Sequence, residues 1–112
     1  MEIQINVDCA DLDRMVSFYG AALGYTPHGS AGSTYRSMTR PGLPKLVFQR
    51  VPESKVVKNR VHLDVIVGPE IEAEAARWVG LGATRVEHIE EFDGEWIVML
   101  DPEGNELCIC NC

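Results

Sequence analysis

The sequence lacks an excess of basic residues, since 10 Lys and Arg stand against 17 Asp and Glu for a formal net charge of −7. An acidic surface repels phosphate backbones, so we expect no nucleic-acid partner. Long hydrophobic runs are also missing, and none approaches the roughly 20 apolar residues that cross a bilayer, so we expect no membrane partner. Residues 1–5 lack the basic and apolar parts of a signal peptide, which favours a cytoplasmic location.

Cysteines are few, and their spacing is not typical of a disulfide framework or a zinc site. Three of the four form a Cys-x-Cys-x-Cys run over residues 108–112. This run lacks the Cys-x-x-Cys pairs of structural zinc sites. Because alternate residues of a strand point the same way, the spacing also does not indicate a disulfide framework. We expect reduced thiols.

The composition is that of a globular protein, with 46% hydrophobic and 24% charged residues in a chain of 112 residues. Either half alone would bury too little surface to be stable. The sequence therefore predicts a single domain over residues 1–112, in which any repeated halves share a core.

Hydrophobic periodicity predicts a strand followed by a helix at the start of the chain. Apolar and polar residues alternate over residues 3–7, and apolar residues recur at helical spacing over 12–23. Asp11 is the expected N-cap of this helix, and Gly24 is its expected stop. Turn residues divide the next stretch into three strands, expected at 25–29, 34–39 and 45–51.

The same order of elements recurs when the chain is shifted so that Gln4 meets His62. A strand is expected over 61–67 and a helix over 70–81 with Gly82 as its stop, and three strands follow, near 84–89, 95–100 and 105–110. The sequence therefore predicts an α+β fold made of two βαβββ modules, residues 1–57 and 58–112.

Each first strand has one apolar and one polar face. The apolar face, expected to meet the helices, comprises Ile3, Ile5 and Val7, then Val61, Leu63, Val65 and Val67. The opposite face comprises Gln4 and Asn6, then His62 and Asp64. On the last strands Leu46, Phe48, Leu107 and Ile109 are expected to face the helices, leaving Val47 and Gln49, then Glu106, Cys108 and Cys110, on the far side. These far sides predict a concave small-molecule site, with a solvated sheet face as the alternative.

Several motifs together resemble the vicinal oxygen chelate (glyoxalase and bleomycin-resistance) superfamily. They are Asn6–Arg14 leading to Ser17-Phe18-Tyr19, then Leu23-Gly24-Tyr25, and Asp101-Pro102-Glu103-Gly104-Asn105 before the last strand. The segments Phe48–Glu53 and Arg60–Asp64 resemble its short glyoxalase-like branch. The resemblance covers the whole chain and implies paired modules whose curved sheets form a cavity.

The resemblance also implies where a divalent metal would bind. The corresponding positions are Gln4 and His62 on the first strands and Gln49 and Cys108 on the last. Only His62 is a usual ligand, and Glu106 could replace Cys108 as an oxygen donor. Since His62 and Glu106 make a thin ligand set, a divalent metal is considered but not favoured. The alternatives are a hydrogen-bonded His62 and a Cys108 that fills space as a small hydrophobe.

Two functions follow from the resemblance. The first is a lyase or isomerase of unassigned substrate, with His62 and Glu106 as catalytic residues and Gln4, Asn6, Gln49, Asp64, Trp96 and Cys108 as substrate-binding residues. The second is non-catalytic binding of a drug or metabolite, as in bleomycin-resistance proteins. The resemblance further implies a homodimer, and an accessory domain that mainly pairs with itself or with a partner protein is a third hypothesis. His28 and His88 show no partner pattern and are expected to be surface residues.

Overall fold

The computed structural model describes residues 1–30, 32–91 and 93–111. Its internal contacts divide the chain into two units, Met1–Ser54 and Lys55–Cys112, and each unit is described by itself. Within the described residues, neither helix is long and apolar enough to cross a membrane. The prediction of a single domain with its module boundary between residues 57 and 58 stays a prediction.

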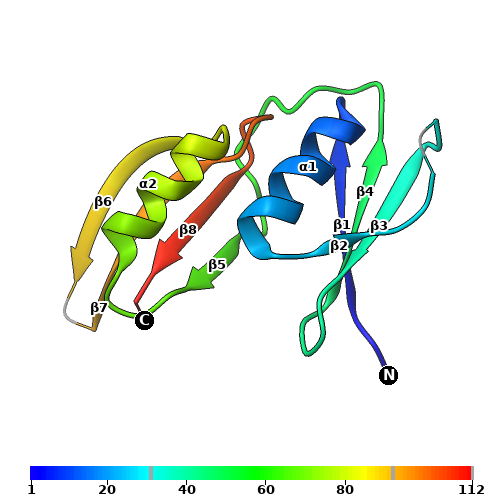
Figure 1. Ribbon diagram of the computed structural model, residues 1–112. Helices are drawn as coiled ribbons and strands as arrows, with labels where there is room; N and C mark the ends of the chain where they lie inside the picture. The colour runs from blue at the N-terminus through cyan, green and yellow to red at the C-terminus, as the bar shows by residue number, and fades with distance from the viewer. Residues whose placement is uncertain (31, 92, 112) are drawn as a thin grey trace. The chain divides into compact units, whose positions relative to one another are not determined.

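The first unit is a four-stranded mixed sheet with one helix packed on it (Figure 1). In chain order its elements are β1 (Gln4–Cys9), α1 (Leu12–Leu23), β2 (Thr26–Pro27), β3 (Tyr35–Thr39) and β4 (Lys45–Arg50). The strand order is β1-β4-β3-β2, in which β1 and β4 are parallel and the other pairs antiparallel.

Helix α1 begins and ends where the sequence predicts. The side chain of Asp11 accepts a hydrogen bond from the backbone N–H of Arg14 at 3.1 Å, which satisfies one of the N–H groups left open in the first turn. Gly24 ends the helix with φ at 71°, a conformation that glycine adopts without steric cost. Leu46 and Phe48 of β4 are buried, as predicted for the face beneath the helix.

The second unit repeats this topology. Its elements are β5 (Leu63–Ile66), α2 (Ile71–Leu81), β6 (Thr84–Glu91), β7 (Gly94–Leu100) and β8 (Glu106–Cys110), and its strand order is β5-β8-β7-β6. Strands β5 and β8 are parallel, whereas β8 with β7 and β7 with β6 are antiparallel. The predicted α+β fold with two βαβββ modules is confirmed.

The core of the second unit lies between α2 and one face of its sheet. Ile71, Ala75 and Trp78 are the buried residues of α2, and β7 and β8 contribute Ile97, Met99, Leu107 and Ile109. Each of these four strand residues is at most 1% exposed. Because side chains alternate across a strand, their neighbours in sequence are placed on the opposite face, where the candidate site lies.

Two of the expected helix-facing residues do not reach the helices. Ile3 is 72% exposed and Val61 is 81% exposed. Both precede the first paired residue of their strand, because pairing begins at Gln4 in β1 and at Leu63 in β5. Strand β2 is also shorter than predicted, since it covers Thr26–Pro27 alone, although the backbone N–H of His28 still donates to the carbonyl of Ser37 at 2.8 Å.

Candidate functional site

A hollow of about 400 Å³ lies on the face of the second unit's sheet that α2 does not cover. Its lining is Lys58, His62, Asp64, Trp96, Val98, Glu106, Cys108 and Cys110. The strand residues among these lining groups alternate with the buried Ile97, Leu107 and Ile109. His62 and Glu106, predicted to share a site, therefore do line one hollow.

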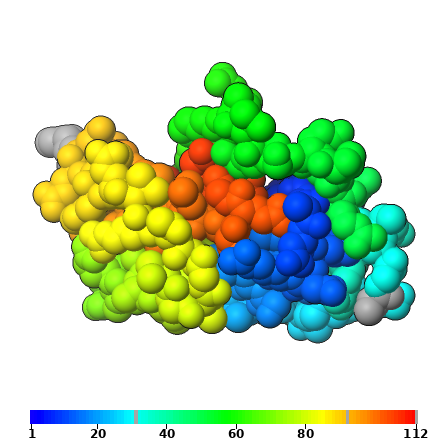
Figure 2. All heavy atoms as spheres, turned by 90° about the horizontal axis from the view of Figure 1, so that it is seen from above, coloured from blue at the N-terminus to red at the C-terminus, as the bar shows by residue number. Residues whose placement is uncertain are grey.

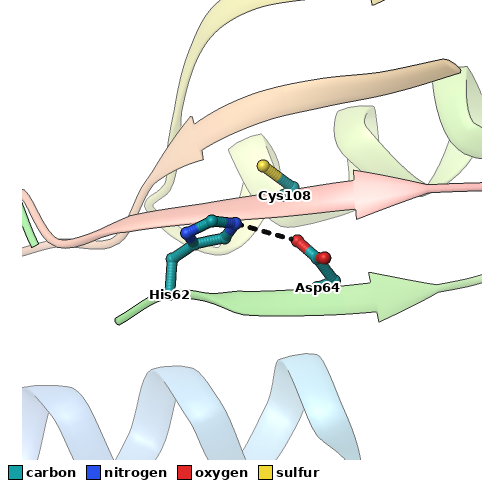
Figure 3. Close-up of side chains that lie close together, drawn as sticks. All are labelled: His62, Asp64 and Cys108. Atoms are coloured by element: carbon teal, nitrogen blue, oxygen red, sulfur yellow. Dashed lines mark ion pairs between the residues drawn. The ribbon is translucent and has the colours of Figure 1, made fainter. Parts of the chain in front are cut away.

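Three different donor atoms converge at one place in this hollow. The Nε2 atom of His62 lies 3.2 Å from Oδ1 of Asp64. Together with Sγ of Cys108 these ligand atoms all lie within 4.8 Å of one another. Figure 3 shows that His62 and Asp64 come from the β5 segment and Cys108 from the neighbouring β8. The register explains the convergence, because Asp64 pairs with Cys108 across the parallel ladder.

The donor set fits a small divalent metal ion. Two ligands of a tetrahedral zinc ion are about 3.3 to 3.8 Å apart, given metal–ligand bonds of about 2.0 to 2.3 Å. The His62–Asp64 separation of 3.2 Å lies just below this range, and Sγ of Cys108 lies within 4.8 Å of both ligand atoms. Imidazole, carboxylate and thiolate together favour zinc or a similar transition metal over Ca²⁺ or Mg²⁺. Three protein ligands also leave a position for a substrate atom, as in catalytic zinc sites.

Glu106, which the sequence suggested as an oxygen ligand and a catalytic residue, is engaged by other residues at the hollow. Its Oε2 accepts the backbone N–H of Asn59 at 2.9 Å, and its Oε1 accepts a hydrogen bond from Nζ of Lys55 at 3.1 Å. The side chain of Asn59 also donates to the backbone carbonyl of Glu106 at 3.1 Å. The green segment containing these partners lies against the red-orange C-terminal segment in Figure 2.

These bonds keep Glu106 ionised. The hydrogen bond from the backbone of Asn59, helped by Lys55, lowers the pKa of Glu106 from 4.5 to about 2. A carboxylate with such a low pKa is a poor proton donor near neutral pH. The contacts therefore favour a structural role, in which Glu106 fixes residues 55–59 at the rim of the hollow, over the predicted catalytic role.

The turn before β8 sets the position of Cys108. Asp101 is 3% exposed, and its Oδ1 accepts the backbone N–H groups of Glu103 at 2.9 Å and Asn105 at 3.0 Å. Its Oδ2 accepts the side-chain amide of Asn105 at 2.8 Å. The Asp101–Asn105 motif thus forms a closed turn directly ahead of β8, and so supports its register.

The remaining predicted site residues divide between the two units. Trp96 lines the hollow, as predicted for a substrate-binding residue. Gln4, Asn6 and Gln49 belong to the first unit, and their proposed part in one site with His62 stays a prediction.

The strand register corrects one predicted equivalence between the two modules. Asn6 pairs with Val47 in β4, while Gln49 pairs with Asp8. Asn6 occupies the position in the first module that Asp64 occupies in the second, and Asp64 pairs with Cys108. The residue equivalent to Cys108 in the first module is therefore Val47, and not Gln49 as predicted.

Sequence reasoning missed two features of the second unit. Lys58 lines the hollow from a loop, where no periodicity indicates side-chain direction. His88 does have partners, since its Nε2 lies 2.9 Å from Oε2 of Glu95. This contact joins β6 to β7, so predicting it from the sequence would require knowing the register of that hairpin. Cys112, the last of the predicted cysteine run, lies outside the described residues.

The sequence matches the family model of the glyoxalase-like domain over residues 4–110. No curated protein matches it significantly. Among solved structures, a glyoxalase/bleomycin resistance protein/dioxygenase family enzyme from Burkholderia phytofirmans is 21% identical, with a TM-score of 0.76, 96% of this chain covered and 94% of that one.

Two further solved structures share the fold at lower identity. A hypothetical protein from S. aureus is 15% identical, with a TM-score of 0.80 and coverage of 100% and 94% of the two chains. A fosfomycin resistance protein, FosX, from Listeria monocytogenes, in complex with Mn(II) and a dihydroxypropylphosphonic acid, is also 15% identical, with a TM-score of 0.81 and coverage of 96% and 86%. Together with the family match, these structures confirm the resemblance to the vicinal oxygen chelate superfamily.

Proposed function

Because the chain belongs to the glyoxalase-like domain family, we propose that the hollow of its second unit binds a small oxygenated molecule beside a divalent ion held by His62, Asp64 and Cys108. The observation that carries this proposal is the convergence of nitrogen, oxygen and sulfur donors within 4.8 Å in a hollow of about 400 Å³. A volume of this size suits a small organic molecule.

The residues around the donors give the ligand a polar and an apolar end. Trp96 and Val98 offer an apolar wall, and Lys58 offers a positive charge at the rim. A ligand with an oxygen at the His62 end and a hydrocarbon or ring against Trp96 matches this lining. When bound, a divalent ion acts as a Lewis acid on such an oxygen, which suits a lyase or isomerase.

Metal binding is tested with Co²⁺, whose thiolate complexes absorb in the near ultraviolet. We expect the purified full chain to show this absorption on titration and the Cys108→Ser variant to lose it. Cys9→Ser is the matched control, because Cys9 is also a buried cysteine but lies on β1 of the first unit. The proposal fails if the wild-type chain shows no thiolate band, or if Cys108→Ser keeps it unchanged.

Catalysis is tested separately on the metal-loaded protein. We expect exchange of a carbon-bound proton with deuterated water on at least one member of a panel of small 2-oxo and 2-hydroxy compounds, followed by NMR. Asp64→Asn should lower the exchange rate together with the metal affinity, because Asp64 contacts His62 at 3.2 Å. Metal uptake without any exchange would leave the binding part of the proposal standing and remove the lyase or isomerase part.

A second candidate function is metal-independent binding of a cationic or aromatic molecule. It is favoured by the presence of Trp96 beside the half-exposed carboxylate of Asp64 in one hollow. Quenching of Trp96 fluorescence by cationic aromatic compounds, equal with and without a chelator, is the expected signature. A quench that requires added metal would instead support the first function.

We also propose that the protein forms a homodimer. The support in the second unit is a set of exposed apolar side chains, comprising Val56, Val57, Val61 and Ile66, which range from 65% to 86% exposed. Light scattering at micromolar concentration should give twice the chain mass of 12.4 kDa. A monomeric mass would contradict this.

The cytoplasm is the location that we propose. The support is the cysteine spacing in the sequence, which is not typical of a disulfide framework, because disulfides are rare in that compartment. Fractionation of cells that produce the protein should place it with cytoplasmic markers, and recovery with a secreted fraction would contradict this proposal.

A further inference from the structure

A second group of metal-ligating side chains lies on the β6–β7 hairpin. It comprises His88 and Glu90 of β6 and Glu95 of β7, and one ligand atom of each lies within 4.8 Å of the others. The Nε2 atom of His88 is 2.9 Å from Oε2 of Glu95 and 4.0 Å from Oε1 of Glu90. Two carboxylates from neighbouring strands therefore face the same imidazole nitrogen.

The hairpin register places this group away from the hollow. Glu90 pairs with Glu95, and His88 pairs with Ile97. Residues directly opposite in an antiparallel pair share a face, and Ile97 is a fully buried core residue on the α2 side. The three ligands thus lie on the α2 face of the sheet, opposite to His62, Asp64 and Cys108.

The other imidazole nitrogen of His88 faces a third carboxylate. Its Nδ1 lies 3.8 Å from Oε1 of Glu72, in the first turn of α2. Glu72 is itself held by an ion pair with Arg85. Metal-binding histidines commonly direct one nitrogen to the metal and the other to a carboxylate, which fixes the tautomer and the ring orientation. In the same way, Glu72 faces Nδ1 of His88, and Glu90 and Glu95 face Nε2.

The charge balance of the hairpin also favours a bound cation. Glu90 and Glu95 are like charges directly opposite in the ladder, an arrangement that destabilises a sheet unless it is compensated. Oε1 of Glu95 accepts a hydrogen bond from the uncharged side chain of Asn111 at 3.4 Å, and Arg85, a basic residue of β6, is engaged by Glu72 on both of its terminal nitrogens. A divalent ion at Nε2 of His88 would neutralise both carboxylates at once.

We propose that His88, Glu90 and Glu95 form a site for a divalent transition-metal ion of the Zn²⁺ type, with Glu72 as a positioning residue. One imidazole and two carboxylates suit such an ion, and the imidazole disfavours Ca²⁺ and Mg²⁺. Binding links the β6–β7 hairpin through His88 to the start of α2. This site shares no residue with the hollow, and its proposal does not depend on the proposed function.

Calorimetric titration of the full chain with Zn²⁺ tests the site. We expect His88→Gln to remove one bound ion per chain relative to wild type, in the Cys108→Ser background as well as in the native sequence. The Co²⁺ complex at this site should lack thiolate absorption, which separates it from the complex expected in the hollow. The two proposals can therefore fail independently.

Two control variants separate coordination from general changes in charge and packing. Glu72→Gln should weaken Zn²⁺ binding at this site by about 10- to 100-fold, the usual effect of losing a carboxylate partner of a metal-bound histidine. Arg85→Gln breaks the same Glu72–Arg85 ion pair but keeps the carboxylate, so it should leave the affinity within a few-fold of wild type. Glu91→Gln, which removes an equal charge from the neighbouring position of β6, should do the same.

The proposal is overturned if His88→Gln binds as many Zn²⁺ ions as wild type with equal affinity. It is also overturned if Glu91→Gln or Arg85→Gln weakens binding as much as Glu72→Gln, since the effect would then be one of bulk charge. Circular dichroism of each variant in the absence of metal confirms that it folds before the titration is interpreted.

Discussion

The contacts of Glu106 predict a stability that depends on pH. Its carboxylate accepts hydrogen bonds from Asn59 and Lys55, and its pKa is lowered from 4.5 to about 2. A shift of this size corresponds to about 3 kcal/mol if solvent screens none of it. The side chains of Glu106 and Lys55 are 18% and 20% exposed, so screening applies. We therefore expect Glu106→Gln to lower the free energy of unfolding by about 1–2 kcal/mol at pH 7.

The sign of the pH dependence follows from the direction of the shift. A carboxylate whose pKa is lowered by folding stabilises the protein fully above the unfolded pKa of about 4.5, and this stability is lost as the pH falls towards 2. The difference between wild type and Glu106→Gln should therefore shrink steadily between pH 4.5 and pH 2.

Urea denaturation followed by tryptophan fluorescence measures this difference. Both tryptophans of the chain, Trp78 and Trp96, belong to the second unit, so the signal reports on the unit that contains Glu106. Glu91→Gln is the matched control for the loss of one negative charge. The reasoning is refuted if Glu106→Gln and Glu91→Gln have the same effect at pH 7, or if the cost of Glu106→Gln stays constant down to pH 2.

Three further predictions concern stability. Trp78→Ala should cost about 3–5 kcal/mol because Trp78 is the largest fully buried side chain of α2, as measured by denaturation with Trp96 as the reporter, and a cost below 1 kcal/mol would contradict the described core. Asp101→Ala should cost about 2–3 kcal/mol in the same assay, since it leaves buried N–H groups of the turn without their acceptor, whereas Asp101→Asn should cost less. Asp11→Ala should cost about 1 kcal/mol by loss of the N-cap of α1, measured by circular dichroism, and an unchanged transition would count against the cap.

The periodicity of the sequence predicts the elements well because burial has to follow it. A strand covered on one face must alternate, as β1 and β5 do, and a helix on a sheet must repeat its apolar residues at helical spacing, as α1 does. The ends of elements are less predictable. Val61 continues the alternation of β5 but precedes the first paired residue, and nothing in its own residue type indicates that.

The candidate site was only partly predictable for the same physical reason. Alternation places His62, Asp64 and Cys108 on one face, and the β5–β8 register adds that Asp64 lies opposite Cys108. The role of Glu106 depends on Lys55 and Asn59, which come from an irregular loop. Loop side chains have no period, so their contacts cannot be derived from spacing.

The two modules carry different side chains at equivalent positions of their parallel strand pairs, β1–β4 and β5–β8. The second unit sets Asp64 opposite Cys108, whereas the first sets Asn6 opposite Val47. The isopropyl group of Val47 has no donor atom, and the uncharged amide of Asn6 is a weaker ligand of a transition-metal ion than the carboxylate of Asp64. The first unit therefore keeps the backbone of the repeat without the carboxylate and the thiolate at these positions. A metal site of the kind proposed for the hollow would therefore depend on His62, Asp64 and Cys108 of the second unit. Exchanging Asn6 and Val47 for Asp and Cys should not by itself create a second thiolate site, because Gln4 would stand in the place of His62.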